Sequence, residues 1–236
     1  MSAIGETTAV ISLGASCQTA WQITRNLALL TTLAGEPLQD SALPFDWLIL
    51  PPAGLLSALK PGAARFPAGI ADLIPGPPQS NGAFLWPEHG FYFWHDFLPQ
   101  NGANFDAIFE NARQKYDYLW RKFDAMARKR RRIFIISNTQ NNLDWVSEIC
   151  SGLDIVFSHR ILARLRAALN ALFPEGENRL LAVTYKSRFT AGERIADGDG
   201  IALIRRDTTR WEGRTEIWAR VLAEQWPAPG PNLAQS

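Results

Sequence analysis

The chain has 236 residues, of which 47% are hydrophobic and 20% are charged, and its formal net charge at pH 7 is +1. These values are typical of a globular protein, and we expect a single α/β domain over residues 1–226 with a loose tail over 227–236. The nearly neutral charge argues against nucleic acid or an acidic membrane surface as a partner. With two cysteines, no run of about 20 apolar residues and no leader-like N-terminus, the sequence predicts a cytoplasmic protein without disulfides.

The hydrophobic pattern predicts strands that alternate with helices along the chain. Helices are expected at 17–30, 53–59, 143–151, 161–172 and 215–225, with a longer one that begins at 105 and ends in the basic cluster 128–132. Strands are expected at 8–13, 133–136, 154–157, 180–185 and 201–205. Residues 61–82 are rich in proline and glycine, which favours a loop there, either a lid or plain surface. The basic cluster 128–132 is expected to be the solvated end of the long helix.

This alternation of apolar strands and amphipathic helices predicts a mostly parallel sheet flanked by helices, in a three-layer, Rossmann-like arrangement. Strands 8–13, 133–136 and 180–185 should pair side by side or through one neighbour. In such folds ligands bind at the carboxyl ends of the strands. Cys17 and Asn138 both follow strands, so we expect them to face one cleft.

A cysteine stands at the expected start of the first helix, after Gly14-Ala15-Ser16. A helix N-terminus has free N–H groups and a partial positive charge, which favour the thiolate and can hold an oxyanion. Cys17 is therefore a candidate nucleophile with a pKa below the free value of about 8.5. Gly14, Ser16 and Gln18 are candidate oxyanion-binding or anion-binding residues. Alternatively, Cys17 is a small buried residue in a turn.

A thiol nucleophile needs a base within hydrogen-bond reach and a group that orients that base. The chain has three histidines, His89, His95 and His159. His95 is the first choice because it lies among aromatic residues near the end of an expected extended segment, 88–96, in which His89 would share its face. His159, which follows the expected strand 154–157, could be the base instead, and a purely structural role stays open for each of the three.

Three residues are candidates to orient the base: Asp46, Asp96 and Asn138. Asp96 adjoins His95, but neighbouring side chains of a strand point to opposite faces, so it would serve only if the chain turns there. Asp46 could instead close a turn with its carboxylate.

No metal or cofactor is expected. Glu88, His89, His95 and Asp96 include metal-ligand types, but their spacing fits no common zinc pattern. The turn before Cys17 has neither the three glycines of a dinucleotide site nor the lysine of a phosphate-binding loop.

Three stretches together resemble a largely uncharacterised domain family whose members are described as papain-like cysteine peptidases. They are Ser12-Leu13-Gly14-Ala15-Ser16-Cys17-Gln18-Thr19-Ala20, Pro44-Phe45-Asp46-Trp47 and Trp94-His95-Asp96-Phe97. The resemblance covers roughly residues 8–140. It implies Cys17 as nucleophile and His95 as base, leaves the third member open, and makes a papain-like α+β fold the alternative to the parallel sheet.

Three functions follow as hypotheses. The first is a thiol-dependent hydrolase or acyltransferase that uses a Cys17–His95 pair on a peptide, amide or ester. The second is a transferase or binding protein for a phosphorylated or sugar ligand at the Cys17 helix N-terminus. The third is a non-catalytic domain whose aromatic cleft binds a peptide or glycan.

Overall fold

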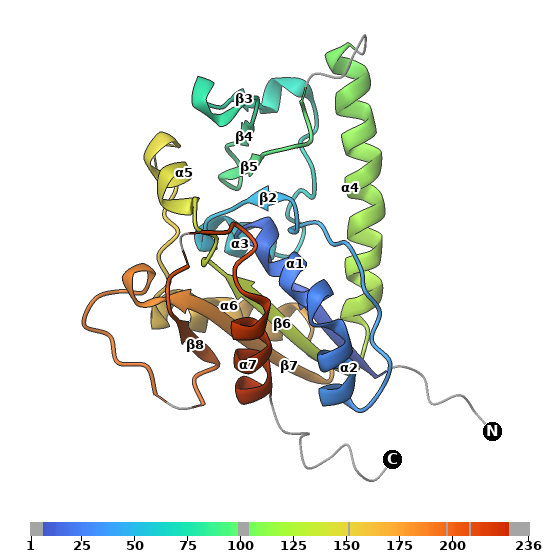
Figure 1. Ribbon diagram of the computed structural model, residues 1–236. Coiled ribbons are helices and arrows are strands. Elements are labelled where there is room, and N and C mark those ends of the chain that lie inside the picture. The colour runs from blue at the N-terminus through green and yellow to red at the C-terminus, as the bar shows by residue number, and fades with distance from the viewer. Residues whose placement is uncertain (1–6, 99–103, 151, 197, 208, 227–236) are drawn as a thin grey trace, which may run out of the picture.

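A four-stranded parallel sheet forms the centre of the computed structural model, which describes residues 7–98, 104–150, 152–196, 198–207 and 209–226 (Figure 1). The strands lie in the order β1 (Thr8–Ser12), β6 (Arg131–Ser137), β7 (Glu177–Tyr185) and β8 (Ile201–Ile204). Ile11 pairs with Phe134, and Phe134 pairs with Leu180. The predicted parallel sheet and the side-by-side pairing of its first three strands are confirmed.

Helices cover both faces of this sheet because its strands are apolar on both sides. One face packs against α3 (Pro52–Ala58), α4 (Phe105–Ala127) and α6 (His159–Leu172). The other face packs against α1 (Cys17–Arg25), α2 (Leu27–Ala34) and α7 (Thr215–Gln225). Successive β6 residues alternate between the layers: Ile133 contributes to the second core and Phe134 to the first.

A small antiparallel sheet, which the sequence did not predict, lies beside the carboxyl end of β1. Its strands run in the order β2 (Leu48–Ile49), β5 (Phe91–Phe93), β4 (Phe84–Trp86) and β3 (Ile74–Pro75). The Leu50 N–H donates to the Ala15 carbonyl over 3.3 Å and so ties this sheet to the turn before α1. Residues of α5 (Leu143–Ile149) pack in one apolar cluster with it.

The prediction that residues 88–96 are extended is wrong, because β5 contains only residues 91–93. Residues 87–90 form the turn between β4 and β5, in which Gly90 has a φ of +69°. His89 therefore lies in this turn rather than on a strand face with His95.

The expected helix 17–30 is two helices, separated at Asn26, whose side-chain Nδ2 donates to the Gln22 carbonyl. The expected strand 154–157 is reduced to one bridge between Phe157 and Phe189. Residues 61–82 are irregular apart from two short 3-10 turns, 70–72 and 78–80, and β3.

The basic cluster is solvated only in part. Arg131 and Arg132 belong to β6 and are 4% and 3% exposed. Arg132 Nη1 donates to the carbonyls of Ala127 and Lys129, so this guanidinium closes the C-terminus of α4. The expectation of a solvated helix end is therefore wrong for these two arginines.

No helix within the described residues is long and apolar enough to cross a membrane. The predicted tail, residues 227–236, lies outside the described residues. One apolar cluster contains side chains of both sheets, among them Phe134 and Phe93. The single domain over 1–226 stays a prediction.

Candidate functional site

The turn between β1 and α1 places Cys17. Gly14 has a φ of +71°, and a Cβ at this position would lie 2.4 Å from the Phe45 carbonyl oxygen. Glycine therefore allows segment 44–47 to approach this turn closely. Ser16 is the N-cap of α1, and Cys17 is its first residue, as predicted.

The Cys17 thiol is part-buried and donates a hydrogen bond to Gln140 Oε1 over 3.3 Å. Burial raises the pKa of Cys17 to about 11, and the carboxylates of Asp46 and Glu212 act in the same direction. The backbone N–H of Cys17 lowers this pKa, but by less. The predicted pKa below 8.5 is therefore wrong, because desolvation outweighs the effect of the helix start.

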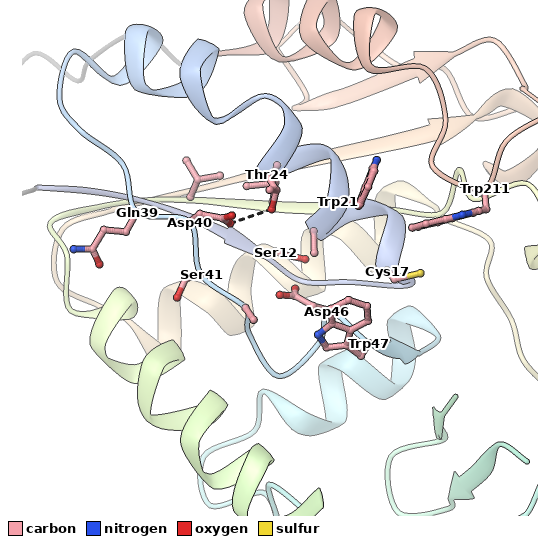
Figure 2. A pocket seen from close by; sticks show the side chains of 14 residues that line it. Ser12, Cys17, Trp21, Thr24, Gln39, Asp40, Ser41, Asp46, Trp47 and Trp211 are labelled. Atoms are coloured by element: carbon pink, nitrogen blue, oxygen red, sulfur yellow. Dashed lines mark hydrogen bonds between the residues drawn. The ribbon is translucent and has the colours of Figure 1, made fainter. Parts of the chain in front are cut away.

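Two pockets meet at Cys17. We call the first, of about 170 Å³, the tryptophan–carboxylate pocket (Figure 2). Its lining includes Ser12, Cys17, Trp21, Thr24, Asp40, Asp46, Trp47 and Trp211. The second, of about 340 Å³, we call the His95 pocket, and its lining includes Cys17, Trp47, Leu48, Ile49, Trp94, His95, Gln140, Asn142, Val146 and Trp211. Cys17, Trp47 and Trp211 line both.

His95 follows β5 in an irregular stretch, 94–98, and its side chain is exposed. Partial burial lowers the pKa of His95, while the Asp96 carboxylate acts in the opposite direction. His95 and Cys17 thus line one pocket, as the cleft hypothesis requires, but no hydrogen bond joins the imidazole to the thiol.

Asp96 and Asn138 point elsewhere. Asp96 accepts from Lys115 Nζ over 2.5 Å and from the Tyr116 hydroxyl over 3.1 Å. Asn138 Nδ2 donates to the Ile155 carbonyl over 2.8 Å and also to the Arg188 carbonyl. Neither residue lines a pocket at Cys17, so the structure does not bring these two candidates to the site.

Asp46 is at the site and is 2% exposed. Its Oδ2 accepts from the Leu43 N–H over 2.6 Å, which is the turn-closing role left open by the sequence. Burial raises the pKa of Asp46 to about 7, against the lowering effect of the Leu43 N–H and the Ser12 hydroxyl. Oδ1 has no hydrogen-bond partner among the described residues.

The side chains predicted to bind an oxyanion do not reach either pocket. The Gly14 N–H donates to Ser12 Oγ over 3.3 Å, and the Ser16 hydroxyl is fully buried. Gln18 accepts from the Thr139 hydroxyl and donates to the Trp211 carbonyl. Donors for an anion would therefore be the backbone N–H groups of the first turn of α1.

The other two histidines have structural partners. His89 is 5% exposed, with Nδ1 2.8 Å from Ser57 Oγ and Nε2 2.9 Å from the Ala64 carbonyl oxygen. His159 Nε2 lies 2.8 Å from the Arg194 carbonyl oxygen. Neither lines a pocket at Cys17.

Gln140 and Trp211 are the site residues that sequence reasoning missed. Gln140 lies three residues after β6, next to the strand-end segment that drew attention to Asn138, so its position was a usable signal. Trp211 is distant from Cys17 in the sequence but lines the same two pockets. A hydrogen bond from Gln18 Nε2 to the Trp211 carbonyl, 2.7 Å long, holds its backbone there. No local pattern indicates that contact.

No group of three histidine, cysteine, aspartate or glutamate side chains within the described residues could hold a metal ion. Comparison with known proteins gave no match: no family model fits the sequence, and no curated protein or solved structure is similar to it.

Proposed function

We propose that this chain is a thiol-dependent hydrolase or acyltransferase that acts on a peptide, amide or ester, with Cys17 as the nucleophile. One observation carries the proposal: the Cys17 thiol, at the first residue of α1, lines the same pocket as His95. Aromatic and aliphatic side chains around this pocket, among them Trp94 and Val146, suit an apolar acyl group.

Because the pKa of Cys17 is raised, the thiol is protonated at neutral pH and needs a base to remove its proton in the first step. His95 takes the Sγ proton as the sulfur attacks the carbonyl carbon, and first-turn N–H groups of α1 stabilise the oxyanion. The leaving amine or alcohol then takes this proton from His95, and a thioester forms on Cys17. Water, or an acyl acceptor in a transferase, attacks the thioester with His95 as base, which releases the acyl product and restores the thiol.

This sequence of steps requires His95 to replace Gln140 as the hydrogen-bond partner of the thiol. His95 lies in the irregular stretch 94–98, outside β5. A change of backbone torsions in this stretch can move the imidazole toward the thiol without altering the strand pairing of β5. Its lowered pKa favours the neutral imidazole at pH 7, the form that accepts a proton.

The test is covalent capture of p-nitrophenyl acetate, followed by mass spectrometry. An acetyl group on Cys17 that is lost in Cys17→Ser and retained in Cys150→Ser is the expected result. Cys150 is the matched control because it is 1% exposed and lies in the core. An equal yield of adduct in Cys17→Ser and wild type would overturn the proposal.

A second candidate is a non-catalytic domain that binds a sugar or peptide ligand. The tryptophans favour it: Trp21, Trp47, Trp94 and Trp211 line the two pockets. A phosphorylated ligand is not favoured, because no lysine or arginine is among the described residues that line either pocket. Ligand binding without any acylation of Cys17 would select this candidate.

We also propose a more specific fold description and a location. The helix–sheet–helix layering supports a Rossmann-like description of the parallel half better than a papain-like one. A cytoplasmic location is supported by the sequence argument from two cysteines that form no disulfide.

A further inference from the structure

We propose that the tryptophan–carboxylate pocket binds an organic ammonium group, such as the end of a short alkylamine. The charged residues of its lining are two aspartates, Asp40 and Asp46, and no lysine, arginine or histidine is among the described residues that line it. This inference concerns binding and does not depend on the chemistry of Cys17.

The buried carboxylate is the first argument. Asp46 is 2% exposed, and although the Ser12 hydroxyl lies near this carboxylate (Figure 2), no donor of the described residues makes a hydrogen bond to Oδ1. A buried carboxylate oxygen without a donor is costly, whereas an ammonium group offers three donors and a compensating charge. In Figure 2 this carboxylate lies next to Ser12 and Trp47, in the wall of the pocket.

The surrounding charges favour a cation over an anion. Asp40 lies on the same pocket, held by the Thr24 hydroxyl over 3.0 Å (Figure 2). Burial is the main cause of the raised pKa of Asp46; the Asp40 carboxylate raises this pKa further, and the positive charge of Lys122 lowers it. Glu212 adds a third negative charge, which acts on Cys17 at the pocket wall.

The aromatic rings suit the same ligand, because an ammonium group is attracted to the face of an indole. Trp47 and Trp211 are 43% and 38% exposed, and both line the pocket. Trp21 packs against Trp211 with ring centroids 5.6 Å apart and already carries the Arg25 guanidinium over its ring. Because the ring of Trp21 already contacts Arg25, the rings of Trp47 and Trp211 are the ones that would contact the carbon chain and the ammonium group of a ligand. A volume of about 170 Å³ suits a small group rather than a long polymer.

The test compares n-butylammonium with n-butanol at about pH 8.5, where Asp46 is ionised and the alkylamine is still protonated, on the full-length Cys17→Ser protein, with tryptophan fluorescence and calorimetry as readouts. We expect the ammonium ion to bind at least about tenfold more tightly than the alcohol, because a charged hydrogen bond and a cation–π contact are added. Asp46→Asn and Asp40→Asn should each remove most of this preference. The exposed Asp117→Asn, which makes the same charge change on α4, should keep it.

Equal binding of butanol and butylammonium, or tighter binding of glucose than of either, would overturn the inference. Asp46→Asn keeps an acceptor for the Leu43 N–H, and its fold is checked by thermal unfolding. Asp40 is exposed, so its variant tests the charge argument independently of folding. If neither variant weakens ammonium binding, the inference fails. Because the protein lacks the Cys17 thiol in every arm, failure here and failure of ester capture are separate results.

Discussion

The Cys17 thiol donates to Gln140 Oε1 over 3.3 Å and so joins the start of α1 to the segment that follows β6. The two residues follow neighbouring strands of the parallel sheet, since Cys17 comes after β1, Gln140 comes after β6, and these strands are paired. The hydrogen bond therefore holds the thiol in a defined place beside the carboxyl edge of the parallel sheet.

Native alkylation should label Cys17 before Cys150. Cys17 is part-buried and opens onto two pockets, whereas Cys150 is 1% exposed. Because the pKa of Cys17 is raised to about 11, its thiolate fraction and its alkylation rate should still increase above pH 9. Iodoacetamide labelling across pH with peptide mass spectrometry measures both. A labelling rate that levels off below pH 8 would instead support the lowered pKa of Cys17 that the sequence predicted.

His95→Ala should abolish acylation of Cys17 while the free energy of unfolding changes by no more than about 0.5 kcal/mol, because the side chain is exposed. His89→Ala is the matched control. It removes a buried imidazole bound to Ser57 and Ala64, so it should cost about 1–3 kcal/mol yet leave acylation of the folded fraction intact. Ester capture and urea denaturation separate the two outcomes. Acylation that survives in His95→Ala would remove His95 as the base.

The parallel half of the fold was predictable because its strands and helices are long enough to show a period. The expected helix 215–225 is α7 with the same bounds, and the strands around Ile11 and Phe134 are paired as expected. The small antiparallel sheet was missed because strands of two or three residues carry no detectable alternation.

The site was predictable only in part. A glycine turn after an apolar strand indicates where Cys17 lies, since that signal is local. The pKa of the thiol was not predictable, because burial and the charges of Asp46 and Glu212 depend on tertiary packing. The direction of Asp96 likewise follows from its contacts with α4 rather than from its position beside His95.

Asp46 should make the protein less stable as pH rises from about 4 to 7. Burial raises its pKa in the folded state from the ordinary 3.8 to about 7, so the folded state binds the proton more tightly than the unfolded state. By linkage, the stabilisation from the protonated carboxyl is present at low pH and is lost as pH rises, by about 4 kcal/mol at most.

Asp46→Asn should remove this contribution, because an amide does not titrate and its oxygen still accepts from the Leu43 N–H. The stability of the variant relative to wild type should thus increase steadily from pH 4 to pH 7.5 in urea denaturation. Contributions from groups that do not interact with Asp46 cancel in this comparison. A difference that is constant over this range would mean that the pKa of Asp46 is not raised.

Gly14→Ala should destabilise the protein more than Gly35→Ala, although both glycines have nearly the same positive φ, 71° and 72°. The shared cost is backbone strain, about 1–2 kcal/mol for a left-handed alanine. At Gly35 a Cβ meets nothing within 4 Å, but at Gly14 it would lie 2.4 Å from the Phe45 carbonyl oxygen. The additional overpacking should cost Gly14→Ala at least about 1 kcal/mol more in urea denaturation.

The same substitution should alter the site, because the approach of Phe45 to Gly14 sets the position of Asp46 and Trp47 beside Cys17. Displacing that segment opens the pocket wall, so iodoacetamide should label Cys17 faster in folded Gly14→Ala than in Gly35→Ala or wild type. Equal unfolding free energies and equal labelling rates for the two alanine variants would show that the close approach at Gly14 does not position the thiol.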